Sequence, residues 1–386
     1  MMKRMLGLIA ASVSVLVLGA ASAGSAADAK APYKIGVIMP LTGNISWLGE
    51  YQKKGSEVRA EMINKAGGVN GRPIELVFYD DQSSPETGTR VAQRLISNDR
   101  VVAITGTGTA VVSAAVASVA NKAKVPAVLQ SGYSLSEKDI AGYVFNNAHR
   151  TDYAIERPMM YFQKKGVTKV ALLMPIGPLG ELGSGIARKY APQHKIEIVG
   201  EEKFDVKAPD VTAQLAKLRA LNPQAIFAFA TGEPAALVAR SMDQLDMTVP
   251  LVVSHGNATP GFLKLVAQTT TPVIVPTGKI MAIEMLKDND PVKKVIAAFA
   301  AEYQKKYNEP ANYYAGQSGD SIAMVAEALR VAGSDDPDKL KAALEGLKNF
   351  PGCNGTYNLS ATDHQGTKMD DMILMTIKGG KWYHFD

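Results

Sequence analysis

Short apolar runs rich in β-forming residues alternate along the chain with segments in which apolar residues recur at helical spacing. The first run begins at Tyr33, and the same rhythm continues to about Gly256. The runs that predict strands are 33–40, 74–80, 101–106, 125–130, 169–175, 196–204, 225–230 and 250–256. Because strands that alternate with helices in this way form parallel sheets covered by helices, the pattern predicts an α/β fold.

The alternation of strand and helix patterns occurs in two successive sets along the chain. The first four strand runs lie before Asn146, and the run at Lys169 starts the same alternation again. The pattern therefore predicts two similar lobes. Two later helical patterns, Pro291–Tyr307 and Asp320–Ala332, must pack on one lobe or the other, and composition does not say which.

The tail of the chain, from Phe350 onward, is rich in turn residues. Within it, the alternating segment Met372–Ile377 predicts a strand, and Gly379–Gly380 predicts the turn of a hairpin. The C-terminus is therefore expected to add hairpin strands to one of the lobes.

The first residues have the pattern of an export signal. Two basic residues precede an apolar run that extends to about Leu18, and small residues follow. This predicts a signal peptide over residues 1–27, cleaved near Ala26 or Ala27, and a mature protein in the periplasm. A membrane anchor is the alternative, but the apolar run is shorter than the roughly 20 residues that a bilayer requires. No cysteine lies near the cleavage region, so a lipid anchor is not expected.

Composition narrows the class of protein further. The chain has 386 residues, enough for two domains with sizeable cores. Its net charge of +5 is spread along helical faces with no basic block, so nucleic acid is not an expected partner. Cys353 is the single cysteine, so the fold must depend on its core rather than on disulfides, and we expect Cys353 to be a small core residue.

Residues for catalysis or metal binding form no recognisable pattern. The five histidines lie far apart without a metal-ligand spacing, so no metal and no cofactor are expected, and each histidine is expected at the surface or at a pocket rim. The turn Thr105–Thr109 lacks the signature of a nucleotide-binding loop. Gly132–Ser136 is close to a nucleophile elbow, but Ser136 stands where a second glycine is needed. A secreted serine hydrolase is therefore the alternative class, with no catalytic residue in the favoured interpretation.

Two hydroxyl-rich turns, Thr105–Thr109 and Ser131–Ser136, directly follow predicted strands. Because the carboxyl ends of parallel strands meet at one crevice, the two turns could contact one ligand together. Hydroxyls, free backbone N–H groups and the positive end of a helix favour an anion, and the lack of a general base favours a bound carboxylate. The alternative is that Thr109, Ser134 and Ser136 are only helix N-caps.

Three features in the segment Lys34–Ile96 carry a family resemblance: the turn Pro40–Gly43, the segment Asn64–Pro73 and the strand end Asp80–Asp81. With them the segment closely resembles the opening lobe of the leucine/isoleucine/valine-binding family of periplasmic solute-binding proteins. The similarity continues through "KVPAVLQSGYS", "AIFAFATGEPAALVARSM" and "PANYYAGQSGDSIAMVAEAL", and so covers essentially the whole mature chain.

The resemblance implies two Rossmann-like lobes with parallel central sheets, joined by a multi-segment hinge. Lobe 1 is expected to comprise residues 32–150 and 283–350, and lobe 2 residues 151–282 and 351–386. The expected crossings lie near 146–152, 282–287 and 350–355.

The resemblance also implies a monomer that is not an enzyme. Such a protein closes on a small solute, which the permease and ATPase of an ABC importer in the inner membrane then collect. A sensor that reports its ligand to a membrane receptor is a further alternative, which the sequence does not separate from an importer.

The resemblance places the ligand between the lobes. Thr109 matches the family's hydroxyl at a helix start, Gly132 and Ser134 match the second turn, and Trp47 matches an apolar or aromatic wall. The expected ligand-binding residues are Trp47, Thr107, Gly108, Thr109, Gly132, Tyr133, Ser134, Leu179, Leu182, Phe229, Thr231, Glu233 and His255.

The second lobe departs from the amino-acid binders of this family, which usually offer a tyrosine turn and an acidic residue there. Leu179 or Leu182 replaces the tyrosine, and His255 stands at the turn where the acid is expected, which leaves Glu233 as the nearby acid. An unpaired buried ammonium costs several kcal/mol. We therefore expect an aromatic or aliphatic carboxylic acid as ligand, with His255 or Thr231 available for a ring hydroxyl. A branched-chain or aromatic amino acid, or an amide, is the alternative.

Overall fold

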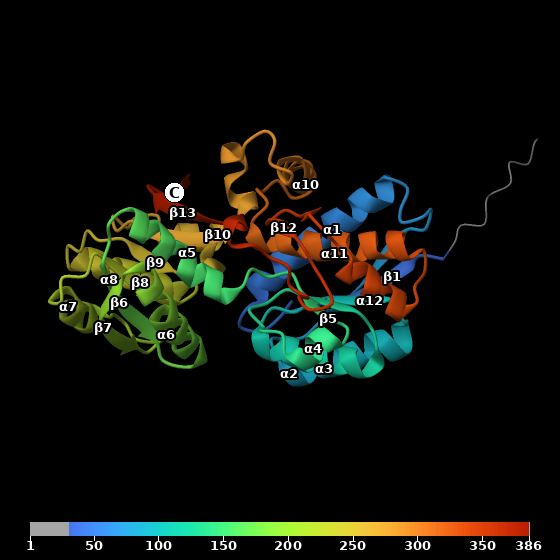
Figure 1. The fold of residues 1–386 in the computed structure, drawn as a ribbon, viewed down its shortest axis with the longest axis horizontal. Helices are drawn as coiled ribbons and strands as arrows, with labels where there is room; N and C mark the ends of the chain where they lie inside the picture. The colour runs from blue at the N-terminus through green and yellow to red at the C-terminus, as the bar shows by residue number, and fades with distance from the viewer. Residues whose placement is uncertain (1–30, 386) are drawn as a thin grey trace, which may run out of the picture.

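The computed structural model describes residues 31–385, which form two lobes that lie side by side (Figure 1). The predicted signal peptide, residues 1–27, lies outside the described residues. The first lobe contains a five-stranded parallel sheet with strand order β2-β1-β3-β4-β5. Its strands are β1 (Tyr33–Met39), β2 (Ile74–Asp80), β3 (Ala103–Gly106), β4 (Ala127–Leu129) and β5 (Val144–Asn146). The helices between them are α1 (Ser46–Lys65), α2 (Pro85–Arg94), α3 (Ala110–Ala123) and α4 (Glu137–Ala141), with a π-helical turn at Leu95–Asp99.

The second lobe contains a seven-stranded sheet with strand order β14-β13-β10-β9-β8-β6-β7. Strands β6 to β10 are parallel, and β13 and β14 are antiparallel at one edge. The strands are β6 (Lys169–Pro175), β7 (Glu197–Phe204), β8 (Ala225–Ala228), β9 (Leu251–Val253), β10 (Val273–Gly278), β13 (Met372–Lys378) and β14 (Lys381–His384). The helices are α5 (Thr151–Lys164), α6 (Pro178–Tyr190), α7 (Thr212–Arg219), α8 (Glu233–Gln244) and α9 (Pro260–Leu265), and the 3-10 segments are Ala191–His194, His255–Asn257, Lys279–Met285 and Met369–Asp371.

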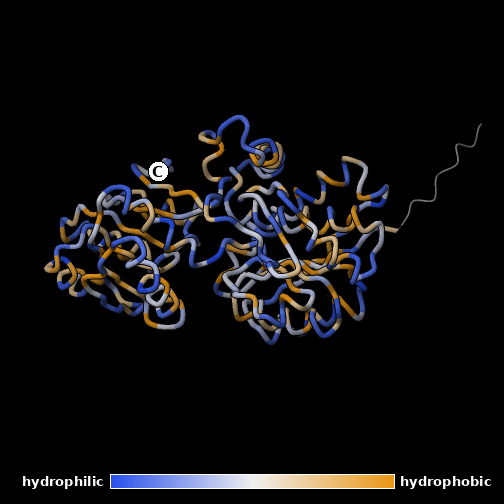
Figure 2. The backbone as a smooth tube through the Cα atoms, viewed as in Figure 1, coloured by the Kyte–Doolittle hydropathy of each residue, from blue (hydrophilic) through white to orange (hydrophobic). Residues whose placement is uncertain are grey.

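Burial explains why the apolar runs become strands. In β1 every residue except Lys34 is buried, because helices cover both faces of the sheet. Figure 2 shows apolar stretches inside both lobes and polar stretches in many outer loops. The α/β fold with two lobes and parallel central sheets, predicted from the alternation, is thereby confirmed.

Each run that predicted a strand contains one, but β5 and β10 were not expected. β5 has only three residues, too few for a periodic signal. β10 contains Pro276, which normally argues against an inner strand. In the structure β9 pairs only with Val273 and Ile274, so Pro276 lies beyond the ladder on that side. At the C-terminus, β13 and β14 form the predicted hairpin, and Gly379 and Gly380 have the positive φ values, 53° and 69°, that its turn requires.

The two late helical patterns both belong to the first lobe, where they form α10 (Lys293–Tyr307) and α11 (Tyr313–Ala332), followed by α12 (Pro337–Glu345). α11 begins earlier than expected because Asn312 caps it, accepting hydrogen bonds from the N–H groups of Tyr314 and Ala315. α1 and α11 approach closely: a Cβ added to Gly55 would lie 2.1 Å from the backbone oxygen of Ala315. Cys353 is buried, as expected of a small core residue.

The third passage between the lobes lies later in the chain than expected. Residues 350–357 form a hairpin, β11 (Phe350–Pro351) and β12 (Thr356–Tyr357), which the buried carboxylate of Asp320 holds by accepting from the N–H of Cys353 at 2.7 Å. Leu359 then packs in the core of the first lobe, and the ring of His364 stacks on Phe145 at 4.0 Å. The chain therefore enters the second lobe only between His364 and β13. A buried acid that captures a hairpin from elsewhere in the sequence leaves no signal in the local pattern.

Candidate functional site

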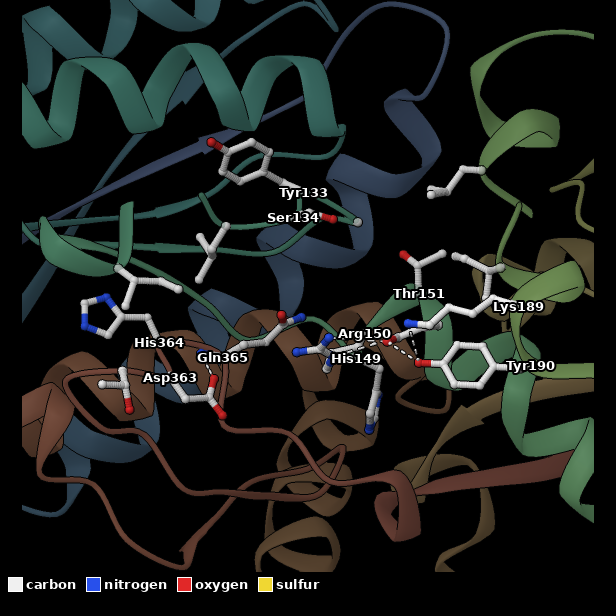
Figure 3. A pocket seen from close by; sticks show the side chains of 17 residues that line it. Tyr133, Ser134, His149, Arg150, Thr151, Lys189, Tyr190, Asp363, His364 and Gln365 are labelled. Atoms are coloured by element: carbon white, nitrogen blue, oxygen red, sulfur yellow. Dashed lines mark hydrogen bonds and ion pairs between the residues drawn. The ribbon is translucent and has the colours of Figure 1, made fainter. Parts of the chain in front are cut away.

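A cavity of about 510 Å³ lies between the lobes (Figure 3). The first lobe, the first and third crossing segments and helix α6 all contribute to its wall. Its lining residues are Gly132, Tyr133, Ser134, Leu135, Ile140, His149, Arg150, Thr151, Asp152, Leu182, Ile186, Lys189, Tyr190, Thr362, Asp363, His364 and Gln365. The cavity thus lies outside the carboxyl ends of strands β4 and β5, which is where open α/β sheets bind ligands.

The turn after β4 forms one wall of this cavity. The side-chain amide of Asn146 donates to the backbone oxygens of Ser131 and Tyr133 at 2.9 and 2.8 Å, which fixes the turn. The phenol of Tyr133 donates to Asp139 at 2.7 Å, and burial together with this bond raises the pKa of Tyr133 to about 12. Ser136 does not line the cavity, because it caps α4 in a capping box with Asp139.

The turn after β3 differs from the expected cradle. The Thr107 hydroxyl is buried and lies 2.5 Å from that of Ser113, which in turn lies 2.6 Å from that of Ser131. Gly108 packs on Pro40, whose Cγ would lie 2.8 Å from an added Cβ. In this structure the Thr107 hydroxyl therefore ties the two turns together inside the lobe and is not open to a ligand. Thr109 caps α3, accepting from the N–H of Val112 at 3.3 Å, and it is partly exposed.

Three of the expected second-lobe residues line two different hollows, and Leu179, Phe229 and His255 line neither. Leu182 lines the 510 Å³ cavity, and Leu179 lies nearby on α6 with 43% of its surface exposed. Thr231 and Glu233 instead line a second, mainly apolar hollow of about 350 Å³ together with Trp47. The carboxylate of Glu233 pairs with Arg240. The sequence pattern had placed all these residues in one site.

Two histidines lie near Tyr313: His149, which is buried, and His255, which is partly exposed. Nδ1 of His149 lies 3.3 Å from the Tyr313 hydroxyl, and the ring of His255 lies 6.4 Å from that of Tyr313 and 6.2 Å from that of Phe229, which is itself buried. Burial lowers the pKa of His149 to about 3 and that of His255 to about 4, so both imidazoles are neutral near pH 7. The histidines were expected at the surface or at a pocket rim; His149 and His364 line the cavity but have only 3% and 0% of their surface exposed.

The cavity also contains a chain of charged and phenolic side chains that the sequence pattern did not indicate. The Nε of Arg150 donates to Asp152 at 3.2 Å, and Asp152 accepts from the Tyr190 hydroxyl at 3.3 Å. The ammonium of Lys189 donates to the same Tyr190 hydroxyl at 3.3 Å. Asp363, on the third crossing segment, accepts from the N–H groups of Gln365 and Gly366, both at 3.0 Å. These residues lie in crossing segments and on a helix flank, where no motif signals a site.

Residues 31–385 contain no group of three or more His, Cys, Asp or Glu side chains placed to hold a metal ion. Within the same range, no helix combines the length and the apolar character that crossing a membrane requires.

Comparison with known proteins agrees with this architecture. Residues 32–381 match the family described as periplasmic binding protein. Leu/Ile/Val-binding protein homolog 3 of Brucella melitensis is 25% identical over 349 residues, covering 89% of this chain and 91% of that protein. The leucine-, isoleucine-, valine-, threonine-, and alanine-binding protein of Pseudomonas aeruginosa is 24% identical over 344 residues, covering 86% of each.

Solved structures show the same fold. An extracellular ligand-binding receptor from Rhodopseudomonas palustris HaA2 has a TM-score of 0.81 at 23% identity, covering 92% of this chain and 99% of that chain. The branched-chain amino acid transporter substrate binding protein LivJ of Streptococcus pneumoniae, solved in complex with isoleucine, has a TM-score of 0.75 at 25% identity, covering 91% and 97%.

The chain therefore belongs to the periplasmic binding protein family, in its leucine/isoleucine/valine-binding branch, and has the type I fold of that family. It is a binding protein and not an enzyme, which removes the serine hydrolase alternative. Binding proteins of ABC importers bind small molecules and work with transporter components in the membrane.

Proposed function

We propose that this protein captures an amino acid between its lobes and delivers it to an ABC importer in the inner membrane. The names of its relatives support an amino acid: two are named for leucine, isoleucine and valine binding, and the LivJ structure contains isoleucine. In this chain one observation carries the proposal. A single interlobe cavity is lined by side chains of both charges. Arg150 and Lys189 are positive, and Asp152 and Asp363 are negative. A zwitterion requires both signs.

From the sequence, a ligand ammonium was not expected, because the second-lobe turns lack a free carboxylate to pair with it. Glu233 does not answer it, since it lines the other hollow and pairs with Arg240. Asp363 does answer it, because the third crossing segment brings its carboxylate to the cavity from outside those turns, whereas Asp152 is itself paired with Arg150. The amino-acid alternative is therefore better supported than the amino-free acid that we expected from the sequence.

In the proposed complex, the ligand carboxylate contacts the Gly132–Ser134 turn, with Thr109 at the neighbouring helix start. The Ser134 hydroxyl is exposed to the cavity, and no Cβ at Gly132 blocks the approach to its peptide. The ammonium lies near Asp363, one of whose oxygens is occupied by two backbone N–H groups. The apolar hollow at Trp47 offers room for an apolar side chain.

A second candidate ligand is an aromatic or aliphatic acid without an amino group. The neutral imidazole of His255, at the turn after β9, favours it, because such a ring can hydrogen-bond a hydroxyl and offers no counter-charge to an ammonium.

A thermal-shift screen with matched pairs tests both candidates. Each pair combines an amino acid with its counterpart lacking the amino group: leucine with 4-methylpentanoate, and phenylalanine with 3-phenylpropanoate. A tight ligand raises the melting temperature by mass action. Stabilisation by the amino acids alone supports the proposal, and stabilisation by the amino-free members alone overturns it in favour of the second candidate.

A further inference from the structure

Lys189 is a cation of the second lobe whose side chain enters the interlobe cavity. It extends from the last turn of α6, and its ammonium donates to the Tyr190 hydroxyl at 3.3 Å (Figure 3). Through Tyr190 and Asp152 it connects to Arg150. Lys189, Asp152 and Arg150 together carry a net charge of one positive unit, because Asp152 is a single acid between two cations.

Among the ion pairs of residues 31–385 none includes Lys189. Its neighbour Arg188, one position earlier on α6, pairs with Glu201 at 2.5 Å. Lys189 is exposed, but its side chain lines the interlobe cavity, and a positive charge inside a cleft attracts an anion more strongly than one at a flat surface.

The same cavity offers further groups for an anion. Its lining includes the Gly132–Ser134 turn and Thr151, the first residue of α5, which has no side chain capping its N-terminus. A Cβ added to Gly132 would lie 3.4 Å from the Thr151 hydroxyl oxygen, so these two groups are neighbours. A carboxylate bound by these groups would share the cavity with the ammonium of Lys189.

We propose that Lys189 is the second-lobe contact of the ligand's carboxylate, so that a free carboxylate draws α6 toward the 132–134 turn and favours closure of the lobes. This inference rests on the proposed function. It adds a ligand requirement: a free carboxylate is essential for tight binding, and the primary amide of the same compound binds the first lobe without engaging Lys189.

Titration calorimetry on four proteins tests this: the wild type, Lys189→Met, the charge-preserving Lys189→Arg and, as matched control, Arg188→Met, which removes a cation from the same helix turn. The ligand is the amino acid that stabilises the wild type most, compared with its primary amide. Lys189→Met should weaken binding of the acid about 5- to 150-fold, the loss expected for a hydrogen bond between charged groups, and leave binding of the amide unchanged. Arg188→Met should change neither affinity, and Lys189→Arg should restore most of the affinity for the acid.

An unchanged ratio of acid to amide affinity in Lys189→Met overturns the role of Lys189 and leaves the proposed function intact. If the wild type binds an amino-free acid instead, the amino-acid proposal fails, and that acid and its amide test Lys189 in the same way. A ligand without any carboxylate overturns both. Circular dichroism of each variant confirms that loss of affinity does not come from loss of fold.

Discussion

Lys279 and Asp371 form an ion pair with 2.9 Å between Nζ and Oδ1, at the point where two chain segments leave the second lobe. Lys279 directly follows β10, and Asp371 directly precedes β13, the antiparallel neighbour of β10. Their side chains are only 14% and 6% exposed. The same ammonium lies 3.0 Å from Asp290, in the loop that leads to α10 of the first lobe. The largely buried ammonium of Lys279 thus links the start of β13 in the second lobe to the loop before α10 of the first lobe.

The first prediction is that Lys279→Met strongly destabilises the protein. The substitution leaves two mostly buried carboxylates without their counter-charge, which costs about 3–5 kcal/mol when one partner of a buried pair is removed. Urea unfolding followed by circular dichroism measures the loss. Lys217→Met is the control, because its partner Glu202 lies at the surface and the Lys217 side chain is 67% exposed, so about 1 kcal/mol or less is expected. Equal unfolding midpoints for the two variants would contradict the structural role of Lys279.

The second prediction concerns pH. Burial lowers the pKa of His255 from 6.5 to about 4, so between these values the unfolded chain binds a proton that the folded protein does not. His255 therefore stabilises the fold above pH 6.5, and this contribution falls as the pH drops toward 4, by at most about 1.4 kcal/mol per pH unit. His149 acts in the same direction, whereas burial raises the pKa of Asp81 to about 6 and acts in the opposite one.

Comparison of the wild type with His255→Gln isolates this contribution, because the other groups titrate in both proteins. The variant should show a shallower decline of the unfolding free energy between pH 6.5 and 4. Parallel curves from urea unfolding at several pH values would mean that His255 is not held neutral by burial.

The third prediction separates the two roles of Thr109. As the cap of α3, it should contribute about 1 kcal/mol to stability, which Thr109→Ala removes. As a ligand contact, it should also contribute about 1–3 kcal/mol to binding. Ser136→Ala is the matched control, since Ser136 caps α4 and is not among the proposed ligand contacts. Melting curves and calorimetry should show lower stability in both variants and weaker binding only in Thr109→Ala. Unchanged affinity in Thr109→Ala leaves it with a capping role alone.

The fourth prediction tests the proposed site of the ammonium. Asp363→Asn removes the charge and keeps an oxygen that can accept from the N–H groups of Gln365 and Gly366. Affinity for the amino acid should fall about 10-fold or more, while affinity for its amino-free counterpart should not fall. Glu233→Gln, which removes a charge from the hollow at Trp47 but keeps a side chain of the same size, should leave both affinities unchanged, because only the ligand's apolar side chain is placed there. A loss in Glu233→Gln and none in Asp363→Asn would transfer the ammonium to the hollow at Trp47.

The fifth prediction is that ligand binding changes the overall shape. A ligand that contacts both lobes shifts the population toward forms in which the lobes are closer together. Small-angle scattering should show a smaller radius of gyration after the ligand is added. An unchanged scattering profile at saturation would indicate that the crossing segments do not bend on binding.

Local periodicity determined most of the fold. The alternation of apolar runs and helical segments from Tyr33 onward is enough to predict two lobes with parallel sheets, because a buried strand and an amphipathic helix each impose their own spacing on the sequence. The same holds for the Gly379–Gly380 hairpin, whose turn geometry depends on two adjacent residues. The Gly132–Ser134 turn was also predictable, since the end of a parallel strand defines its place in the crevice.

Tertiary structure alone decided where distant segments meet. Asp320 holds a hairpin that begins 30 positions later in the sequence, Asp363 reaches the cavity from the tail, and Lys189 reaches it from a helix flank. The Thr107 hydroxyl, which the sequence placed toward the ligand, is used inside the lobe by Ser113. The charge of a binding cavity depends on side chains from distant segments, which come together only when the lobes pack. No single stretch of the sequence therefore predicts it.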